Sequence, residues 1–329
     1  MRRVLRFTLV LVVVLSVFAT WALRASDTCS ALELASHTRP AVAYTMALLG
    51  CLLALRPRRW SGPILLACAL VIGWPTLRLS WGAGARAPDA LLLRVAAANL
   101  LLESDAHRAL LELVDASDAP DIVFISEGNQ ATLASIDALG SAYPHQLLWP
   151  ARERWHVRSM GDAILSKRPF VDQMVHEDGA ILQVAVEHDG DVVTILGAHP
   201  MRPGRPIDIA RRNRTLDRLA ELAEPLDHVV VLGDLNVTEG SRSYARLLRG
   251  GNLRDSRRGF GRQPTWLIDD RFVSSDQRWL ARLVPAMPLD HVLLGDGLVC
   301  TERHVGPDIG SDHLPVFATL ARRAGFAAR

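Results

Sequence analysis

Residues 229–236 read Val-Val-Val-Leu-Gly-Asp-Leu-Asn, an apolar run that ends in an acid and an amide. A continuous apolar run closed by a glycine predicts a buried strand that ends at the rim of a sheet. Asp234 and Asn236 are two residues apart, so in an extended segment their side chains point to the same face. An acid beside an amide can orient a water molecule and accept its proton. The alternative interpretation is an Asx turn after a strand.

A second stretch, residues 310–316, reads Gly-Ser-Asp-His-Leu-Pro-Val and leads into another apolar run. It holds one of two Asp-His pairs late in the chain, and the other pair, Asp290-His291, also adjoins an apolar strand. Because carboxylates orient imidazoles in other acid–imidazole pairs, we expect an acid to hold His313. Asp312 is expected to reach a metal ion.

Three more polar residues, Asn99, Glu127 and His199, follow apolar runs at predicted strand ends. Hard oxygen donors on a rigid rim suit Mg²⁺, and an imidazole can donate a proton or contact a phosphate near neutral pH. Each residue taken alone also fits a turn or a solvated strand end. Together with the two motifs above, they predict a phosphoesterase site built around a divalent metal.

From residue 91 onward, short apolar runs alternate with turn residues and a few helical patterns. Many short strands mixed with few helices predict an α+β sandwich in layers, with polar residues at the strand ends. The predicted strands are 91–98, 121–126, 163–166, 181–186, 192–198, 229–232, 290–294 and 314–320, and the predicted helices are 106–116, 208–222 and 241–248. In the second helix, we interpret the arginines as a solvated face, with contact to a membrane or a phosphate as the alternative; they are Arg211, Arg212, Arg214 and Arg218.

The composition narrows the function classes. The net charge of the 329 residues is only +2, so no broad basic field for gripping nucleic acid is present, although a local basic patch is not excluded. The four cysteines are scattered without a C-x-x-C pair, which argues against a zinc ribbon or a redox pair. The sequence also lacks a P-loop, a Rossmann glycine signature, G-x-S-x-G and H-E-x-x-H.

The first eighty residues predict a membrane module with three spans, at residues 4–23, 40–55 and 63–77. The first span matches the ~20 residues that a helix needs to cross a bilayer, and the other two spans are shorter. Trp74 and Trp81 stand where interfacial aromatic residues usually lie. A cleaved signal peptide is the alternative for the first span, but two apolar segments follow it. A buried helical hairpin of a soluble protein is the remaining alternative.

Arginines predict the orientation of these spans. Arg2 and Arg3 precede the first span, Arg6 lies near its start, and a cluster at 56–59 separates the second from the third. By the positive-inside rule these segments face the cytoplasm, so three spans place the rest of the chain on the extracytoplasmic side. We therefore expect a multi-pass protein of the cell membrane.

Taken in order over residues 91–320, the motifs resemble the endonuclease/exonuclease/phosphatase superfamily, the DNase-I-like fold, in a membrane-anchored bacterial form. The matching segments are Asn99 in AAANLL, Glu127 in DIVFISEGN, GDAILSKRP at 161–169, His199 in LGAHP, Asp234 and Asn236 in VVLGDLN, Pro264-Thr265-Trp266, Asp290 in LDHVLL, and Asp312-His313 in GSDHLPV.

The resemblance implies a four-layer αββα sandwich at residues 91–322, after a membrane module at 1–80 and a linker at 81–90. It also implies Mg²⁺, with Mn²⁺ as the alternative, and in-line attack of water on a phosphate ester or anhydride. Glu127 would be the main metal ligand, with Asn99 and Asp312 nearby.

The resemblance also suggests roles for the remaining residues. Asp234, oriented by Asn236, would position or deprotonate the water. His313, paired with Asp290, would stabilise the phosphoryl charge, and His199 would hold phosphate or protonate the leaving group. The division of acid and base roles among these residues stays open.

Two positions depart from the family pattern. Ser126 precedes Glu127 where many relatives have glutamine, and residues 200–203 read Pro-Met-Arg-Pro where His-Leu is usual. These departures affect expected substrate contacts more than the chemistry.

The expected function is a membrane-anchored phosphohydrolase that acts on a lipid-linked phosphate or pyrophosphate at the bilayer surface, or on a phospholipid headgroup. An extracytoplasmic nuclease is the first alternative, and a non-catalytic binding protein on the same fold is the second. The sequence indicates no obligate protein partner.

Overall fold

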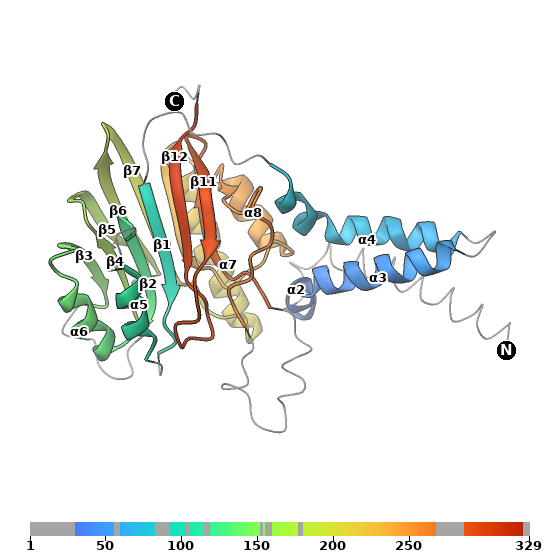
Figure 1. The fold of residues 1–329 in the computed structure, drawn as a ribbon, viewed down its shortest axis with the longest axis horizontal. Coiled ribbons are helices and arrows are strands. Elements are labelled where there is room, and N and C mark those ends of the chain that lie inside the picture. Colours follow the sequence, from blue (N-terminus) through green and yellow to red (C-terminus); the bar gives the residue numbers. More distant parts are fainter. Residues whose placement is uncertain are drawn as a thin grey trace.

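The computed structural model describes residues 30–55, 60–82, 93–102, 105–114, 119–151, 154, 160–176, 180–267 and 286–324. Within these ranges the chain forms a sandwich of two sheets and a helical hairpin that projects from one side of it (Figure 1). The first predicted span, at 4–23, and most of the predicted linker lie outside the described residues.

In the described part of the chain, each sheet has six strands and mixes parallel and antiparallel pairs. The first sheet runs in the order β11 (Leu298–Val305), β12 (Val316–Arg322), β1 (Leu93–Asn99), β2 (Ile122–Gly128), β4 (Gly161–Ser166) and β3 (His145–Trp149). The second sheet runs in the order β5 (Phe170–His176), β6 (Ile181–His188), β7 (Asp191–Ala198), β8 (Val229–Asp234), β10 (Asp290–Leu294) and β9 (Arg254–Asp255).

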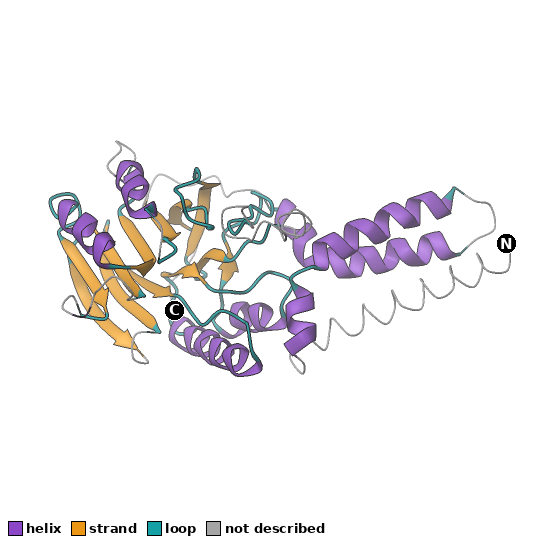
Figure 2. Cartoon of the chain, turned by 90° about the horizontal axis from the view of Figure 1, so that it is seen from below, coloured by secondary structure: helices purple, strands orange, loops and turns teal. Residues whose placement is uncertain are grey.

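Three apolar clusters hold the layers together. The largest lies between the two sheets and includes Phe124 and Leu232. A second packs α5 (Ala106–Val114) and α6 (Gln130–Ala138) on the first sheet, and a third packs α7 (Pro206–Ala223) and α8 (Arg242–Gly250) on the second. Figure 2 shows helices on both outer sides of the strands. The prediction of an α+β sandwich is confirmed.

The strands that the sequence did not predict are the edge strands. β11 and β3 border the first sheet, and β5 and β9 border the second. An edge strand is buried less than a central one, so it needs no continuous apolar run. β5 illustrates this, because four consecutive residues in it are exposed. The predicted central strands all appear, with ends shifted by at most a few residues.

The helical hairpin consists of α3 (Arg39–Ala54) and α4 (Ser61–Leu77). A short 3₁₀ helix, η2 (Arg78–Ser80), extends α4. The short helix α2 (Ser30–Ser36) precedes α3 and lies at the sandwich end of the hairpin (Figure 1). Among the described residues, one helical stretch, Ser61–Ser80, is long and apolar enough to cross a membrane, while Arg39–Ala54 is a shorter apolar helix.

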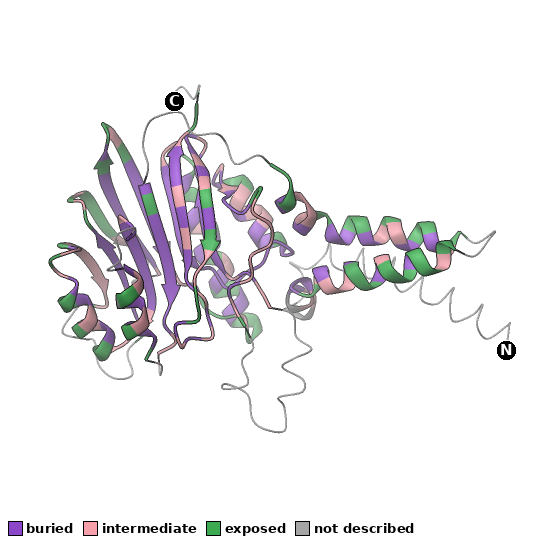
Figure 3. Cartoon of the chain, viewed as in Figure 1, coloured by how far each residue is buried: buried purple, intermediate pink, exposed green. Residues whose placement is uncertain are grey.

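Many large apolar side chains of the hairpin are exposed, in contrast to the buried strands of the sandwich (Figure 3). They are Tyr44, Leu48, Leu49, Leu52, Leu55, Trp60, Ile64, Leu70, Val71 and Trp74. A small internal core, which includes Leu65 and Ile72, joins the two helices. The hairpin is therefore apolar both inside and outside.

Candidate active site

Asn99 and Glu127 meet at the end of the parallel pair β1 and β2. Asn99 is the last residue of β1, and the register of β2 against β4 shifts between Ile125 and Gly128, where Glu127 stands. Glu127 has a φ of 57°, a left-handed conformation that is rare for a glutamate. A bulge of this kind redirects a side chain, and Glu127 accepts a hydrogen bond from Asn99 Nδ2 at 2.9 Å.

Asp234 reaches the same point from the second sheet. Gly233 before it has a φ of 131°, and a Cβ there would lie 2.2 Å from the carbonyl oxygen of Ala198, so only glycine fits. Asp234 Oδ2 accepts from Asn99 Nδ2 at 3.1 Å, and Asp234 Oδ1 accepts from the backbone N–H of Asn236 at 2.9 Å. The predicted orientation of Asp234 thus comes from the backbone of Asn236, while the side chain of Asn236 donates to the Pro200 carbonyl at 3.0 Å.

A three-residue group at this rim has the composition of a metal site. Ligand atoms of Glu127, His199 and Asp234 lie within 4.8 Å of one another. His199 Nε2 is 3.5 Å from Glu127 Oε1 and 3.6 Å from Asp234 Oδ2. Two carboxylates that converge on one point with little exposure need a compensating positive charge, so these residues fit a divalent cation. The roles assigned to them individually stay predictions.

His313 and Asp290 form a buried acid–imidazole pair. Asp290 Oδ2 lies 2.8 Å from His313 Nδ1, and His313 Nε2 lies 3.7 Å from Asp234 Oδ2. The Thr265 hydroxyl accepts from the backbone N–H of Asp290 at 3.1 Å and fixes this end of β10. Burial opposes the charged ring, but Asp290 and Asp234 raise the pKa of His313 to about 10. Burial and the facing Asp290 raise the pKa of Asp234 against the effect of His313.

The sequence did not predict a fourth acid at the rim, Asp162. It lies in β4, and its Oδ1 is 4.0 Å from His199 Nδ1. Burial raises the pKa of Asp162 to about 7, while the pKa of His199 is raised, against burial, by Asp234, Asp162 and Glu127. The only available signal was its place in the GDAILSKRP segment, two residues into an apolar strand.

Asp312 stands next to this cluster but turns to a tryptophan. Its Oδ2 accepts from Trp266 Nε1 at 3.0 Å, and it is not part of the three-residue group. Ser311 donates to the Asn99 carbonyl at 2.8 Å and accepts from the His313 backbone N–H at 3.0 Å, which joins the C-terminal motif to β1. Metal binding by Asp312 remains a prediction.

One predicted solvated residue is buried instead. Arg212 is 0% exposed and contacts Glu33 of α2, so the interpretation of the α7 arginines as a solvated face is wrong at this position. Arg211 and Arg214 are exposed as predicted. Helical spacing alone cannot distinguish one arginine that turns inward, because a buried charge depends on a partner distant in the sequence.

Comparison with known proteins agrees with the fold. The model of the endonuclease/exonuclease/phosphatase family matches residues 95–313, about two thirds of the chain, so the chain belongs to this family. A search of curated proteins found no match to the sequence.

Several solved structures share the fold. Sphingomyelinase C from Streptomyces griseocarneus has a TM-score of 0.51 and 19% identity, and the match covers 70% of this chain and 99% of that one. The β toxin of Staphylococcus aureus with bound magnesium ions has a TM-score of 0.51 and 19% identity, and the match covers 69% of this chain and 99% of that one. An endonuclease/exonuclease/phosphatase from Beutenbergia cavernae has a TM-score of 0.54 and 22% identity, and the match covers 70% of this chain and 72% of that one.

The protein is therefore a phosphoric ester hydrolase. A divalent cation at the rim would neutralise charge on the phosphoryl oxygens. Asp234, held by the Asn236 backbone, faces the cluster and can accept a proton from water. His313 is charged near neutral pH and can donate a hydrogen bond to a phosphoryl oxygen, while Asp290 keeps Nε2 directed at the site.

Proposed function

We propose that this protein is a membrane-anchored, divalent-metal-dependent phosphoesterase that uses Mg²⁺ and hydrolyses a lipid-linked phosphate or pyrophosphate. Residues 1–80 form its membrane module, 81–90 its linker and 91–322 its catalytic domain, which lies outside the cytoplasm. The proposal for the metal is supported by the Glu127, His199 and Asp234 group, since carboxylate oxygens suit Mg²⁺.

The observation that carries the membrane proposal is the exposed apolar surface of the α3–α4 hairpin. Leu55, which follows α3, and Trp60, which precedes α4, are each 82% exposed. The end of the hairpin where α3 stops and α4 begins is the one farthest from the sandwich (Figure 1). Exposed apolar surface of this extent is costly in water and favourable in a bilayer. In addition, Glu33 of α2 and Leu79 of η2 both contact the sandwich. This is expected when the loop after a first span and the end of a third span lie on one side of the membrane.

A lipid substrate is supported by the surface beside His199. Met201 and Ile207 are about half exposed, and Arg202 and Arg211 beside them are exposed too. Cationic and apolar side chains together suit the headgroup region of a phospholipid surface. The nearly balanced charge of the chain argues against a grip on duplex DNA. A membrane tether also raises the local concentration of a lipid substrate.

The test is hydrolysis by the full chain reconstituted in vesicles with Mg²⁺. The panel contains a prenyl pyrophosphate, a phospholipid, and single-stranded and duplex DNA, each repeated with EDTA and with Asp234→Ala. We expect the parent to cleave a lipid substrate, EDTA to abolish this cleavage, and Asp234→Ala to show none. Cleavage of DNA alone would make the protein a nuclease, and cleavage of no substrate by a folded chain would favour a binding protein.

The orientation needs a separate experiment. A reporter enzyme that is active only outside the cytoplasm is fused after Arg329, and a matched fusion is placed in the arginine cluster at 56–59. We expect activity from the first fusion alone. Activity from the second alone would reverse the proposed topology.

A further inference from the structure

The loop that follows the predicted catalytic Asp234 is buried between the sandwich and the membrane module. Every residue from Asn236 to Ser241 is buried, although the segment is neither strand nor helix. Buried irregular backbone needs hydrogen-bond partners from elsewhere. Several partners of this loop, residues 236–241, come from α2 and α4.

Arg212 connects the loop to α2. Its guanidinium is fully buried, and Nη1 donates to the Asn236 carbonyl at 3.0 Å while Nη2 donates to Glu33 Oε1 at 2.5 Å. The hydroxyl of Ser241, at the other end of the loop, donates to the same Glu33 oxygen at 2.7 Å. One carboxylate of α2 therefore binds both the arginine that holds Asn236 and the last residue of the loop.

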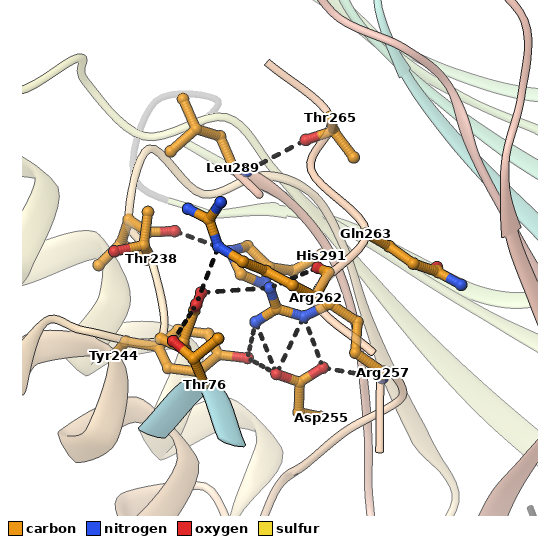
Figure 4. A network of polar contacts seen from close by, with 12 residues as sticks. Thr76, Thr238, Tyr244, Asp255, Arg257, Arg262, Gln263, Thr265, Leu289 and His291 are labelled. Atoms are coloured by element: carbon orange, nitrogen blue, oxygen red, sulfur yellow. Dashed lines mark hydrogen bonds and ion pairs between the residues drawn. The ribbon is translucent and has the colours of Figure 1, made fainter. Parts of the chain in front are cut away.

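Three further contacts join the same loop to the module. His37 Nδ1 lies 2.9 Å from the Thr238 hydroxyl. Thr76, at the end of α4, donates to Glu239 Oε1 at 2.8 Å (Figure 4). Gly240 packs on the Ser36 carbonyl so closely that a Cβ would lie 2.4 Å from its oxygen. The side chains at this contact are buried, so water does not compete with them.

Glu33, His37 and Thr76 all lie outside residues 95–313, the part that matches the family model. The match to sphingomyelinase C covers 99% of that protein but only 70% of this chain. The family domain in this chain thus carries an added support for its Asp234 loop.

We propose that the membrane module is part of the active-site scaffold, and that Glu33, acting through Arg212, is a positioning residue for the reaction proposed above. Arg212 fixes the Asn236 carbonyl, and the Asn236 N–H in turn holds Asp234 Oδ1. Small displacements of a reacting group have large effects on rate, so loosening this chain of contacts lowers turnover without removing any group that touches substrate.

The test uses the full chain in detergent with a water-soluble phosphodiester, bis(p-nitrophenyl) phosphate, so that access to lipid plays no part. The variants are Glu33→Gln, Arg212→Met and the double variant. The matched controls are Glu221→Gln and Arg218→Met, each of which breaks an exposed ion pair in α7, the helix that holds Arg212. Measurements are kcat, KM, the thermal unfolding midpoint and hydrogen exchange of residues 234–241.

We expect Glu33→Gln to lower kcat about tenfold with KM within about twofold of the parent, and both controls to match the parent. The double variant removes both charges, so its unfolding midpoint returns toward that of the parent. Its kcat stays low, because the Asn236 carbonyl has lost its donor. Recovery of kcat in step with the midpoint would show a purely structural role and overturn the proposal, as would a Glu33→Gln enzyme with parental kcat.

Hydrogen exchange separates this inference from the proposed function. If the parent hydrolyses neither this diester nor any substrate of the panel above, the proposed function fails, but faster exchange of residues 234–241 in Glu33→Gln than in Glu221→Gln still supports the scaffold. Equal exchange in the two variants would refute it.

Discussion

Two charged groups in the sandwich are largely shielded from solvent, yet they are built differently: the rim at Glu127, His199 and Asp234, and the cluster around Arg257. In the second, which we call the Arg257 cluster, Arg257 contacts Asp255 and Glu239, and Tyr244 donates to Asp255 at 2.6 Å (Figure 4). The guanidinium of Arg257 lies 2.7 Å from Asp255 Oδ2. At the rim, His199 lies 3.5 to 4.0 Å from its three acids.

The pKa values follow this difference. Burial raises the pKa of Asp255, but Arg257 outweighs it and holds that pKa well below its usual range. At the rim, burial dominates instead and raises the pKa of Asp162 to about 7. A cluster whose acids are matched by arginines stabilises the fold, whereas an excess of acids in loose contact is suited to binding a cation and substrate.

The largest expected effect distinguishes the two clusters by activity. Asp234→Asn should lower turnover of a soluble phosphodiester by about a thousandfold, because it removes the group that accepts the water proton. The metal-free unfolding midpoint should stay the same or rise, since the buried charge that burial disfavours is gone. Kinetics and thermal unfolding of the full chain check both. Loss of stability together with activity would place Asp234 among the structural acids.

The second prediction removes the positive charge of the Arg257 cluster, whereas the first removes a negative charge at the rim. Arg257→Met leaves Asp255 and Glu239 buried without their shared cation and should destabilise the protein by about 3 to 5 kcal/mol. Arg218→Met, which breaks an exposed pair with Glu221, should cost less than about 1 kcal/mol. Chemical denaturation measures both. Equal losses would mean that burial does not set the contribution of these ion pairs.

The third prediction concerns metal binding without turnover. Saturating Mg²⁺ should raise the free energy of unfolding by about 2 to 3 kcal/mol if its concentration is about a hundred times Kd. Asp234→Asn should lose most of this gain, while Arg218→Met should keep it. A thermal shift with and without EDTA is the measurement. A gain that survives in Asp234→Asn would place the cation elsewhere.

The central sandwich could be predicted from the sequence, because buried strands such as 229–232 are continuous apolar runs. The edge strands could not, since β5 pairs on one side only and exposes much of its length. The hairpin helices were also predicted, but α2 was not. Its seven residues lie between the first two predicted spans, in a segment without a clear helical pattern. Contacts with Arg212 and Ser241 accompany its packing on the sandwich.

At the site, residues that end strands were easier to predict than those that support them. Asp234 and Glu127 follow apolar runs, whereas Asp162 lies within a strand and Thr265 reaches Asp290 across the fold. Arg212 resembles its neighbours in sequence and differs only in facing a carboxylate 179 positions away. Support of this kind depends on long-range geometry, which no local pattern contains.

The smallest expected effect concerns the pH dependence of stability, in which His291 of the Arg257 cluster should differ from His313 at the rim. His313 is held by acids, whereas burial and Arg257 lower the pKa of His291 to about 4. His291 Nε2 lies 2.8 Å from the Val237 carbonyl, and its Nδ1 has no hydrogen-bond partner among the described residues, so a proton there would be buried without an acceptor. The unfolded chain binds that proton below about pH 6.5, so stability should fall between pH 6.5 and 4. His291→Gln should remove about 2 kcal/mol of the stability difference between pH 7 and pH 4.5, measured by urea denaturation. An unchanged difference would mean that folding does not lower the pKa of His291.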